Sequence, residues 1–401
     1  LSFTWNYTIS QKLRIGNMLS VDQNNTEESP YGSFSKYTEV NPYERAYDEM
    51  GRCIKRLSNG EANPVFDATL NNVNKSKSTS FNDNFDFEWY IVEGIRLTGR
   101  FAYTYGTTHS DVFVSPKSSQ FEDQQDDKDK GSYDYSNSST HSMDGNIVVN
   151  AWKSIDKHMF TLVLGANMQD NKEDNKSFSA TGFLSDKLTN LDFAMQYREG
   201  AKPRGSVSQD RLIGFFANAS YAYDNRYLFD FSYRTDGSSK FGKNNKWGYF
   251  PAFSAAWRLG EEEFIKNLNI FSDLKVRLGY GMAGNNRIDS YLSLAVLGSV
   301  TYPNGDSTQP GYVSKQIPNP DLKWEANKTF NFGLDFGFFN QRLTISPEFY
   351  INRSSNLLLN AKLPTSSGYN SMVINAGETE NKGIDLTINS TNITNKNFTW
   401  N

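Results

Sequence analysis

The fold of this chain is decided by residues 210–283, which read DRLIGFFANASYAYDNRYLFDFSYRTDGSSKFGKNNKWGYFPAFSAAWRLGEEEFIKNLNIFSDLKVRLGYGMA. Apolar and polar side chains alternate there with a period of two, so each parity forms one face of a strand. In residues 274–282 one parity carries Leu274, Val276, Leu278, Tyr280 and Met282, and the other carries Lys275, Arg277, Gly279 and Gly281. In residues 227–234 the parities are Tyr227, Phe229, Phe231 and Tyr233 against Leu228, Asp230, Ser232 and Arg234. Charge is confined to one face, and the other face is aromatic.

The same alternation predicts about fourteen strands along the chain. They cover residues 1–7, 13–22, 77–91, 95–105, 144–154, 159–169, 211–223, 227–236, 248–258, 273–283, 324–338, 342–352, 380–390 and 397–401. Asp335 and Glu348 lie on the polar parity of their strands, as Lys275 and Arg277 do. A Lys or Arg that faces lipid at mid-depth costs about 2–4 kcal/mol, so one uncharged face in many strands is typical of a membrane barrel.

The connections between these strands alternate in length. Short turns are predicted at residues 8–11, 92–94, 155–158, 224–226, 339–341 and 391–396. Long polar connections are predicted at residues 23–76, 106–143, 170–210, 237–247, 284–323 and 353–379. Antiparallel strands joined in this way place all turns at one end of a sheet and all loops at the other, which in outer-membrane barrels are the periplasmic and extracellular ends. The connection GEEEFIKNLNIFSD, on the turn side, is long enough for one short helix.

A soluble antiparallel sandwich or propeller alternates in the same way, because its strands also bury one face. Strands of ten or more residues, aromatic residues near strand ends and loops segregated by side favour the membrane barrel. The fold class is therefore all-β, with an antiparallel transmembrane β-barrel as the leading interpretation. Pro347 lies in mid-strand on the apolar parity, where we expect a local bulge.

Composition excludes several other classes. No run of about 18 apolar residues is present to form a membrane-spanning helix. The single cysteine, Cys53, excludes an intrachain disulfide framework, and a net charge of −4 without a basic stripe gives no indication of a nucleic-acid partner. Both ends fall within alternating runs. We therefore expect residues 1–401 to be an internal part of one transmembrane barrel domain of a longer protein.

No catalytic constellation, cofactor site or metal site is predicted. Gly279, Gly281 and Gly284 spell G-x-G-x-x-G, but charged residues alternate through the preceding strand and no helix follows, so a dinucleotide site is disfavoured. The three histidines lack metal-ligand spacing and are expected in loops or a turn. Residues 122–131, EDQQDDKDKG, resemble a cation-binding loop, yet the glycine is misplaced for an EF-hand, and a solvated acidic loop is favoured.

Four segments in matching order and spacing carry a resemblance: DGSSKFGKNNKWGYFPAFSAAW (236–257), LKVRLGYGMAGNN (274–286), NPDLKWE (319–325) and GETENKGIDL (377–386). The chain resembles the SusC/RagA-type TonB-dependent transporters of the Bacteroidota outer membrane. The family-motif positions are Asp236, Gly237, Ser238, Ser239, Phe241, Trp247, Gly248, Phe250, Pro251, Gly284, Asn285, Asn286, Asn319, Pro320, Trp324, Glu325, Asn381 and Gly383.

The resemblance implies a 22-stranded barrel in the outer membrane of a Gram-negative bacterium, with an N-terminal plug and long extracellular loops. It also implies a SusD-like surface lipoprotein that covers the extracellular mouth, and energy coupling through TonB–ExbB–ExbD. No plug, TonB-contacting segment or final strands are found in this sequence. The implied function is import of oligosaccharides or oligopeptides, with outer-membrane lipid around the barrel; it is not that of an enzyme.

Six charged residues on the polar parity are predicted to face the barrel lumen: Asp230, Arg234, Lys275, Arg277, Asp335 and Glu348. Contact with a plug or with enclosed water is favoured for them over contact with substrate. Two alternatives stay open at this point. One is a soluble or surface-attached β-sandwich adhesin, and the other is a non-transporting barrel that acts in secretion or assembly.

Overall fold

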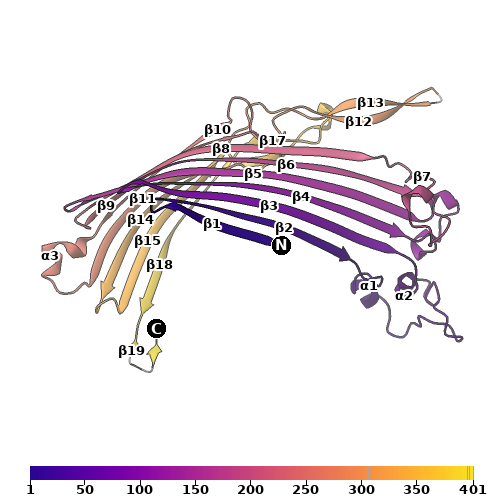
Figure 1. Cartoon of the computed structure of the whole chain (residues 1–401), viewed down its shortest axis with the longest axis horizontal. Coiled ribbons are helices and arrows are strands. Elements are labelled where there is room, and N and C mark those ends of the chain that lie inside the picture. Colours follow the sequence, from indigo (N-terminus) through magenta and orange to yellow (C-terminus); the bar gives the residue numbers. More distant parts are fainter. Residues whose placement is uncertain (306, 395, 397, 401) are drawn as a thin grey trace.

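The computed structural model describes residues 1–305, 307–394, 396 and 398–400. These residues form one long, curved antiparallel sheet of 14 strands (Figure 1). In spatial order it consists of β1 (Ser2–Ser10), β2 (Leu13–Glu27), β3 (Val73–Val92), β4 (Ile95–Val114), β5 (Ser132–Ile155), β6 (His158–Thr181), β8 (Arg204–Tyr223), β9 (Tyr227–Ser238), β10 (Trp247–Trp257), β11 (Asp273–Asn285), β14 (Glu325–Phe338), β15 (Leu343–Ser355) and β18 (Glu378–Ser390), with β7 (Gln196–Tyr197) beside β6. The order along the chain is the order in space, so the sheet is a meander.

Smaller elements lie outside this sheet. Three hairpins pair β12 (Val296–Asn304) with β13 (Ser307–Gln316), β16 (Leu358–Lys362) with β17 (Ser371–Asn375), and β19 (Ile393–Thr394) with β20 (Thr399–Trp400). The helices are α1 (Ser35–Thr38), α2 (Pro64–Ala68) and α3 (Glu263–Lys266), and the 3-10 turns are η1 (Ser119–Phe121), η2 (Asp127–Asp129), η3 (Leu191–Phe193), η4 (Leu259–Glu261) and η5 (Thr365–Ser367). The short helix expected between β10 and β11 is therefore present as α3. In the described part of the chain no helix is long and apolar enough to cross a bilayer.

Thirteen of the predicted strands are confirmed in the main sheet. The fourteenth, residues 397–401, lies partly outside the described residues, and its Thr399 and Trp400 pair with β19 instead of the main sheet. The predicted loops 106–143 and 170–210 are too long, because β5 and β6 each run for 24 residues. Alternation could not reveal these extensions, since both parities of the strands become polar beyond the apolar part. His109 and His141, expected in loops, consequently lie in β4 and β5.

The connections separate by side as predicted. At the turn end of the sheet, strands are joined by short turns and by α3; at the loop end lie α1, α2, β7 and the long connections (Figure 1). The turn between β8 and β9 contains Asp224 and Asn225 with φ of +49° and +53°, a conformation that Asp and Asn tolerate and that tight hairpin turns require. The residue types in this turn therefore suit the backbone conformation that a tight hairpin between twisted strands requires.

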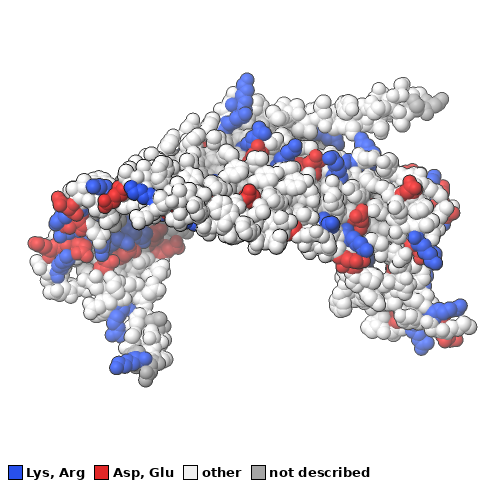
Figure 2. All heavy atoms as spheres, viewed as in Figure 1, with Lys and Arg blue, Asp and Glu red and all other residues white. Residues whose placement is uncertain are grey.

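The two faces of the sheet differ sharply. The apolar face, defined by the parity of Phe229, Leu278 and Phe332, leaves these three side chains 42%, 40% and 40% exposed. The polar face carries Arg234 and Arg277, both held in ion pairs. No second layer covers the apolar face among the described residues, so the β-sandwich alternative is wrong. Figure 2 shows charged side chains gathered toward the two ends of the strands, with a nearly uncharged band between them.

The height of this uncharged band can be derived from the apolar-face residues of strand β6. Its apolar-face residues from the turn end are Phe160, Leu162, Leu164, Ala166 and Met168. The next residue of this parity, Asp170, forms an ion pair of 2.8 Å with Arg211 of β8. Nine residues rise about 30 Å along a strand and, at a tilt of about 40°, cover about 23 Å. This height matches the apolar band of outer-membrane barrels, about 25 Å.

An aromatic row closes the band at the turn end. Cross-strand pairing aligns Trp257, Tyr227, Tyr223 and His158, with ring centroids 6.0, 6.2 and 5.0 Å apart in turn. Tyr227 Oη and Trp257 Nε1 donate to Glu262, beside α3, at 2.7 and 3.1 Å. The hydrogen bond from Tyr227 is the main reason that the pKa of Glu262 lies below its usual value. Rings with one wet end suit the boundary between hydrocarbon and water.

The bulge expected at Pro347 is absent. Pro347 pairs with Leu386 of β18 in an unbroken register, and on the β14 side the ladder resumes in the same register after the positions of Ser346 and Pro347. Proline lacks an N–H, so it removes hydrogen bonding toward one neighbour only. The strand accommodates this loss without an inserted residue.

We predict that Leu164→Arg, in the middle of the apolar face, destabilises the barrel by about 2–4 kcal/mol, because the cation would face lipid. The folding free energy in lipid vesicles, followed by heat-modifiable migration on gels, measures the effect. Val163→Arg is the matched control, since Val163 lies one residue away on the polar face between Asn150 and Asn218. Equal effects of the two variants would contradict this assignment of faces.

Candidate functional site

A buried aromatic cluster lies near the loop end, where β10 and β11 separate. It consists of Phe241, Phe250, Leu322 and Trp324, which expose 9% of their surface or less. The Trp324 ring lies 4.9 Å from that of Phe241 and 5.4 Å from that of Phe250, and its Nε1 donates to the Lys246 carbonyl at 3.0 Å. Three of the four recognised segments thus meet at one point, since Gly284 of the second segment packs against Phe250 and Trp324.

Hydrogen bonds tie these segments together. Gly242 N–H donates to the Leu322 carbonyl at 3.2 Å, and Asn245 Nδ2 donates to the Asp321 carbonyl at 3.0 Å. The segment that contains Leu322 is also joined to the hairpin β16–β17, where Asn319 Nδ2 donates to the Val373 carbonyl at 2.9 Å. The loop-end connections are therefore cross-linked through residues 319–325.

Gly284 has a steric reason to be glycine. A Cβ at this position would lie 2.1 Å from the Phe250 ring and 3.0 Å from the Trp324 ring, closer than real Cβ atoms come to other atoms. This glycine therefore makes room for the cluster, and the G-x-G-x-x-G pattern has a packing explanation. The preceding strand, β11, continues to Asn285 and opens no helix.

A polar cavity of about 430 Å³ lies beside the cluster. It is lined by Gln169, Asn171, Asp210, Leu212, Asp236, Ser238, Lys240, Gly284, Asn286 and Trp324. Amide, carboxylate, hydroxyl and amine groups thus line the cavity together with an indole ring. Such a set can donate to and accept from hydroxyl or peptide groups, and the ring can pack against an apolar or sugar surface.

Two hydrogen-bonded pairs set the polar walls of this cavity. Arg234 binds Asp236 in a bidentate manner, with both N–O distances 2.6 Å, and also donates to Asn167 Oδ1 at 2.9 Å. Across β6 and β8, Asn171 Nδ2 donates to Asp210 Oδ2 at 3.4 Å. A bidentate pair restrains both partners, so Asp236 is held in a defined orientation.

A second charged network crosses three strands of the polar face. Arg277 of β11 donates to Asp335 of β14 at 2.9 and 3.1 Å and to Glu348 of β15 at 3.0 Å. Lys275 Nζ lies 2.9 Å from Asp335. The guanidinium lies across Gly333, where a Cβ would come within 2.8 Å of Arg277 Nη2. Four of the six residues predicted to face the lumen are therefore in mutual contact.

The other predicted residues lie elsewhere. Asp230 accepts hydrogen bonds from Ser220 and Ser254 at 2.6 and 3.1 Å, apart from the Arg277 network. Gly237 and Trp247 pair with each other on the apolar face. Asn381 and Gly383 lie on β18 and pair with β15, away from the cluster. The fourth recognised segment is thus a strand and contributes nothing to the cavity.

Several cavity residues were missed from the sequence. Gln169 ends a predicted strand, but Asn171 and Asp210 fall in the predicted loop 170–210, which the structure replaces by the polar extensions of β6 and β8. Lys240 lies in the connection after β9. No local pattern distinguishes them from solvated loop residues. Only the cross-strand register, which pairs Asn171 with Asp210, brings them together.

Other sequence candidates have ordinary surroundings. His158 Nδ1 lies 2.9 Å from Tyr221 Oη in the aromatic region of the turn end. In the acidic loop, Lys128 and Lys130 form ion pairs with Asp126 and Asp127 at 3.2 and 2.8 Å. Among the described residues no group of three or more His, Cys, Asp or Glu side chains is placed to hold a metal ion.

A meandering antiparallel sheet with an uncharged band, an aromatic row at the turn end and a polar opposite face defines a β-barrel protein of the outer-membrane type. The chain belongs to the family of TonB-dependent-receptor-like β-barrels, which it matches over residues 10–401. This is a family of outer-membrane receptors and transporters and not a family of enzymes.

Its relatives agree with the SusC/RagA resemblance, which is confirmed. The chain is 33% identical over 356 residues to the TonB-dependent receptor SusC of Bacteroides thetaiotaomicron, covering 85% of this chain and 34% of that protein. It is 31% identical over 349 residues to the TonB-dependent receptor P3 of Formosa agariphila, covering 86% and 34%. A solved structure of the RagAB peptide transporter superposes with a TM-score of 0.80 at 26% identity, covering 98% of this chain and 44% of that one. The chain thus spans about a third of the length of these curated relatives.

We predict that Trp324→Ala destabilises the protein by about 3–5 kcal/mol, because it removes the central ring of a buried cluster. Urea unfolding in detergent micelles measures the change. Trp247→Ala is the control, since Trp247 also lies in a recognised segment, residues 236–257, but is 45% exposed on the apolar face. The cluster would lose its proposed stabilising role if both variants unfolded at the same urea concentration.

Proposed function

We propose that this chain forms part of a transmembrane barrel that imports oligosaccharides or oligopeptides across the outer membrane of a Gram-negative bacterium. Residues 1–401 would belong to a single barrel domain, with the strands crossing the membrane repeatedly. The observation that carries this proposal is the polar cavity next to Trp324, which lies on the face opposite the uncharged band. A water-filled or plugged interior is the expected environment of that face.

The polar groups that line the cavity suit a solute that forms several hydrogen bonds and is larger than a single ion. Its lining combines the Asp236 carboxylate, held by Arg234, with the Asn171 amide and the Trp324 side chain. Sugars and peptides both present donors, acceptors and apolar surfaces, so either class fits this lining. The six charged residues of the polar parity, four of them in the Arg277 network, would contact the plug or enclosed water.

The partners follow from the relatives. The chain is similar to the TonB-dependent receptor SusC and to the RagAB peptide transporter. We infer a SusD-like surface lipoprotein at the loop end and energy from TonB–ExbB–ExbD. The connections at the loop end, which residues 319–325 join together, would form the contact surface for the lipoprotein.

Uptake provides the first test of the proposal. We expect Asp210→Asn combined with Asn171→Ala to lower the uptake rate of the native nutrient at limiting concentration about tenfold, because hydrogen bonds to a charged group are lost. Uptake of fluorescent oligosaccharides and oligopeptides by cells measures it. Asp86→Asn is the control, a carboxylate on the polar face that binds Arg14 near the turn end. Unchanged uptake in cells that lack the whole protein or lack TonB would instead support the secretion or assembly alternative.

Co-purification provides the second test. We predict that affinity purification of the whole protein from detergent-solubilised outer membranes recovers one lipoprotein in equimolar amount. Replacing Asn319 with Ala and Asn245 with Gly should reduce recovery, because these amides join the loop-end connections. A protein purified without any lipoprotein under mild detergent would contradict this partnership.

A further inference from the structure

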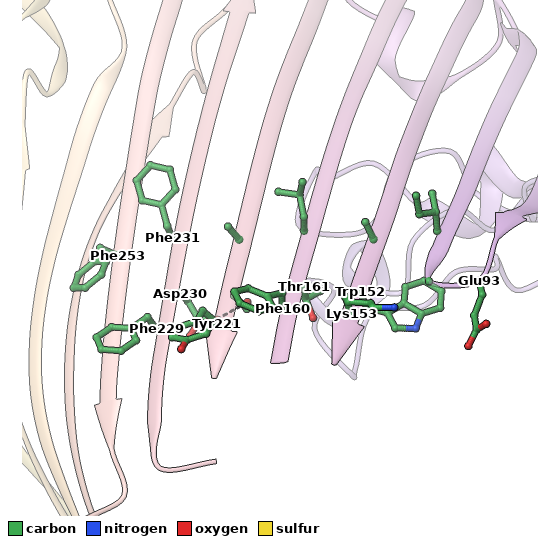
Figure 3. A pocket seen from close by; sticks show the side chains of 16 residues that line it. Glu93, Trp152, Lys153, Phe160, Thr161, Tyr221, Phe229, Asp230, Phe231 and Phe253 are labelled. Carbon is green, nitrogen blue, oxygen red and sulfur yellow. Dashed lines mark hydrogen bonds between the residues drawn. The ribbon is translucent and has the colours of Figure 1, made fainter. Parts of the chain in front are cut away.

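The apolar face contains a hollow near the turn end, about 580 Å³ in volume (Figure 3). Cross-strand register explains its shape. One row across the strands reads Phe253, Phe231, Ala219, Leu162, Ala151 and Ile95. Ala219 and Ala151 interrupt a row of larger side chains, and Phe160, Tyr221 and Phe229 stand in the next row toward the turn end. The result is a narrow depression with aromatic walls in the uncharged band.

Three charged residues border this hollow, Glu93, Lys153 and Asp230 (Figure 3). Asp230 has the polar parity and accepts hydrogen bonds from Ser220 and Ser254, which leaves Lys153 and Glu93 as the charged side chains at its turn end. Lys153 lies on the apolar face, in register with Phe160 of β6. Both side chains are exposed, and the described residues provide neither of them with a hydrogen bond or an ion pair. A cation on this face near the membrane boundary is costly unless its amine reaches the boundary or meets an anion.

We propose that this hollow binds one acyl chain of a zwitterionic glycerophospholipid of the periplasmic leaflet. The inference rests on the membrane location in the proposed function but not on transport. The lipid phosphate would bind the Lys153 amine, and its ammonium would bind the Glu93 carboxylate. An apolar depression that ends in one cation and one carboxylate matches a chain followed by a phosphoethanolamine head group. The turn end lies at the periplasmic side of such barrels, where this lipid class is available.

A second hollow provides an internal comparison. It measures about 420 Å³ and lies on the same face over Gly99, Gly145 and Ala166. Its apolar-face lining contains no charged residue; Arg100, which also borders it, has the opposite parity and donates to Asn84 on the polar face. This hollow is apolar, as an acyl chain requires, but it lacks charged side chains that could bind a head group. Filling it should therefore leave retention of the specific lipid unchanged.

Native mass spectrometry of the whole protein, purified in detergent, tests the proposal. Phosphatidylethanolamine and phosphatidylglycerol are added at equal concentration, and the ratio of lipid-bound to lipid-free protein is recorded. We expect one tightly retained phosphatidylethanolamine. Lys153→Gln should lower its retention about fivefold, as expected for one basic residue at a lipid surface. Glu93→Gln should abolish the preference over phosphatidylglycerol, which has no ammonium group.

Two filling variants separate a specific site from general lipid contact. Ala219→Phe should remove the retained lipid, whereas Ala166→Phe should leave it in place. Equal loss in both variants, no loss with Ala219→Phe, or a second protein copy in place of the lipid would overturn the proposal. A protein that needs detergent but retains no lipid would refute this inference alone. A protein that is monomeric and soluble without detergent would refute the membrane location as well.

Discussion

Backbone hydrogen bonding between neighbouring strands is the constraint on which the rest of the structure depends. Hydrocarbon offers no partner for an N–H or C=O group, so every strand that crosses lipid must be paired on both sides. From β2 to β15 the main sheet meets this requirement in an almost continuous register. That register also decides which side chains stand together, because residues directly opposite share a face.

As a consequence, the two faces of the sheet carry different kinds of side chain. One side presents rows of exposed aromatic and aliphatic residues bounded by the Asp170–Arg211 pair and by the row that includes Tyr227. On the other side, charges are paired across strands, as Arg277 is with Asp335 and Glu348. Glycines allow both arrangements: Gly333 makes room for the guanidinium and Gly284 for the aromatic cluster. Each of these two contacts therefore requires a position without a side chain.

Much of this could be predicted from the sequence, for a physical reason. Alternation survives wherever lipid demands an apolar side chain at every second position, as from Phe160 to Met168, so these strands and their faces were predictable. The extensions of β5 and β6 were not, because water accepts polar residues on both parities. The cavity could not be predicted either, because two of its residues, Asn171 and Asp210, lie in these polar extensions. They are 39 residues apart in the sequence, and only the strand register brings them together. Pro347 was misjudged because a proline breaks hydrogen bonding toward one neighbour only.

The separation of β10 from β11 at the loop end has a mechanical consequence. Toward the loop end, the pairing between them stops at Ala252 and Gly281, one residue short of Pro251. Beyond that point the Phe250 ring packs against Gly284. With no ladder between β10 and β11 there, cohesion depends on the packed rings together with a few hydrogen bonds, such as the one that Gly242 N–H donates to the Leu322 carbonyl. Separating residues 319–324 from the connection between β9 and β10 requires Trp324 to leave its place against Phe241 and Phe250, so this buried ring opposes opening of the loop end of the sheet.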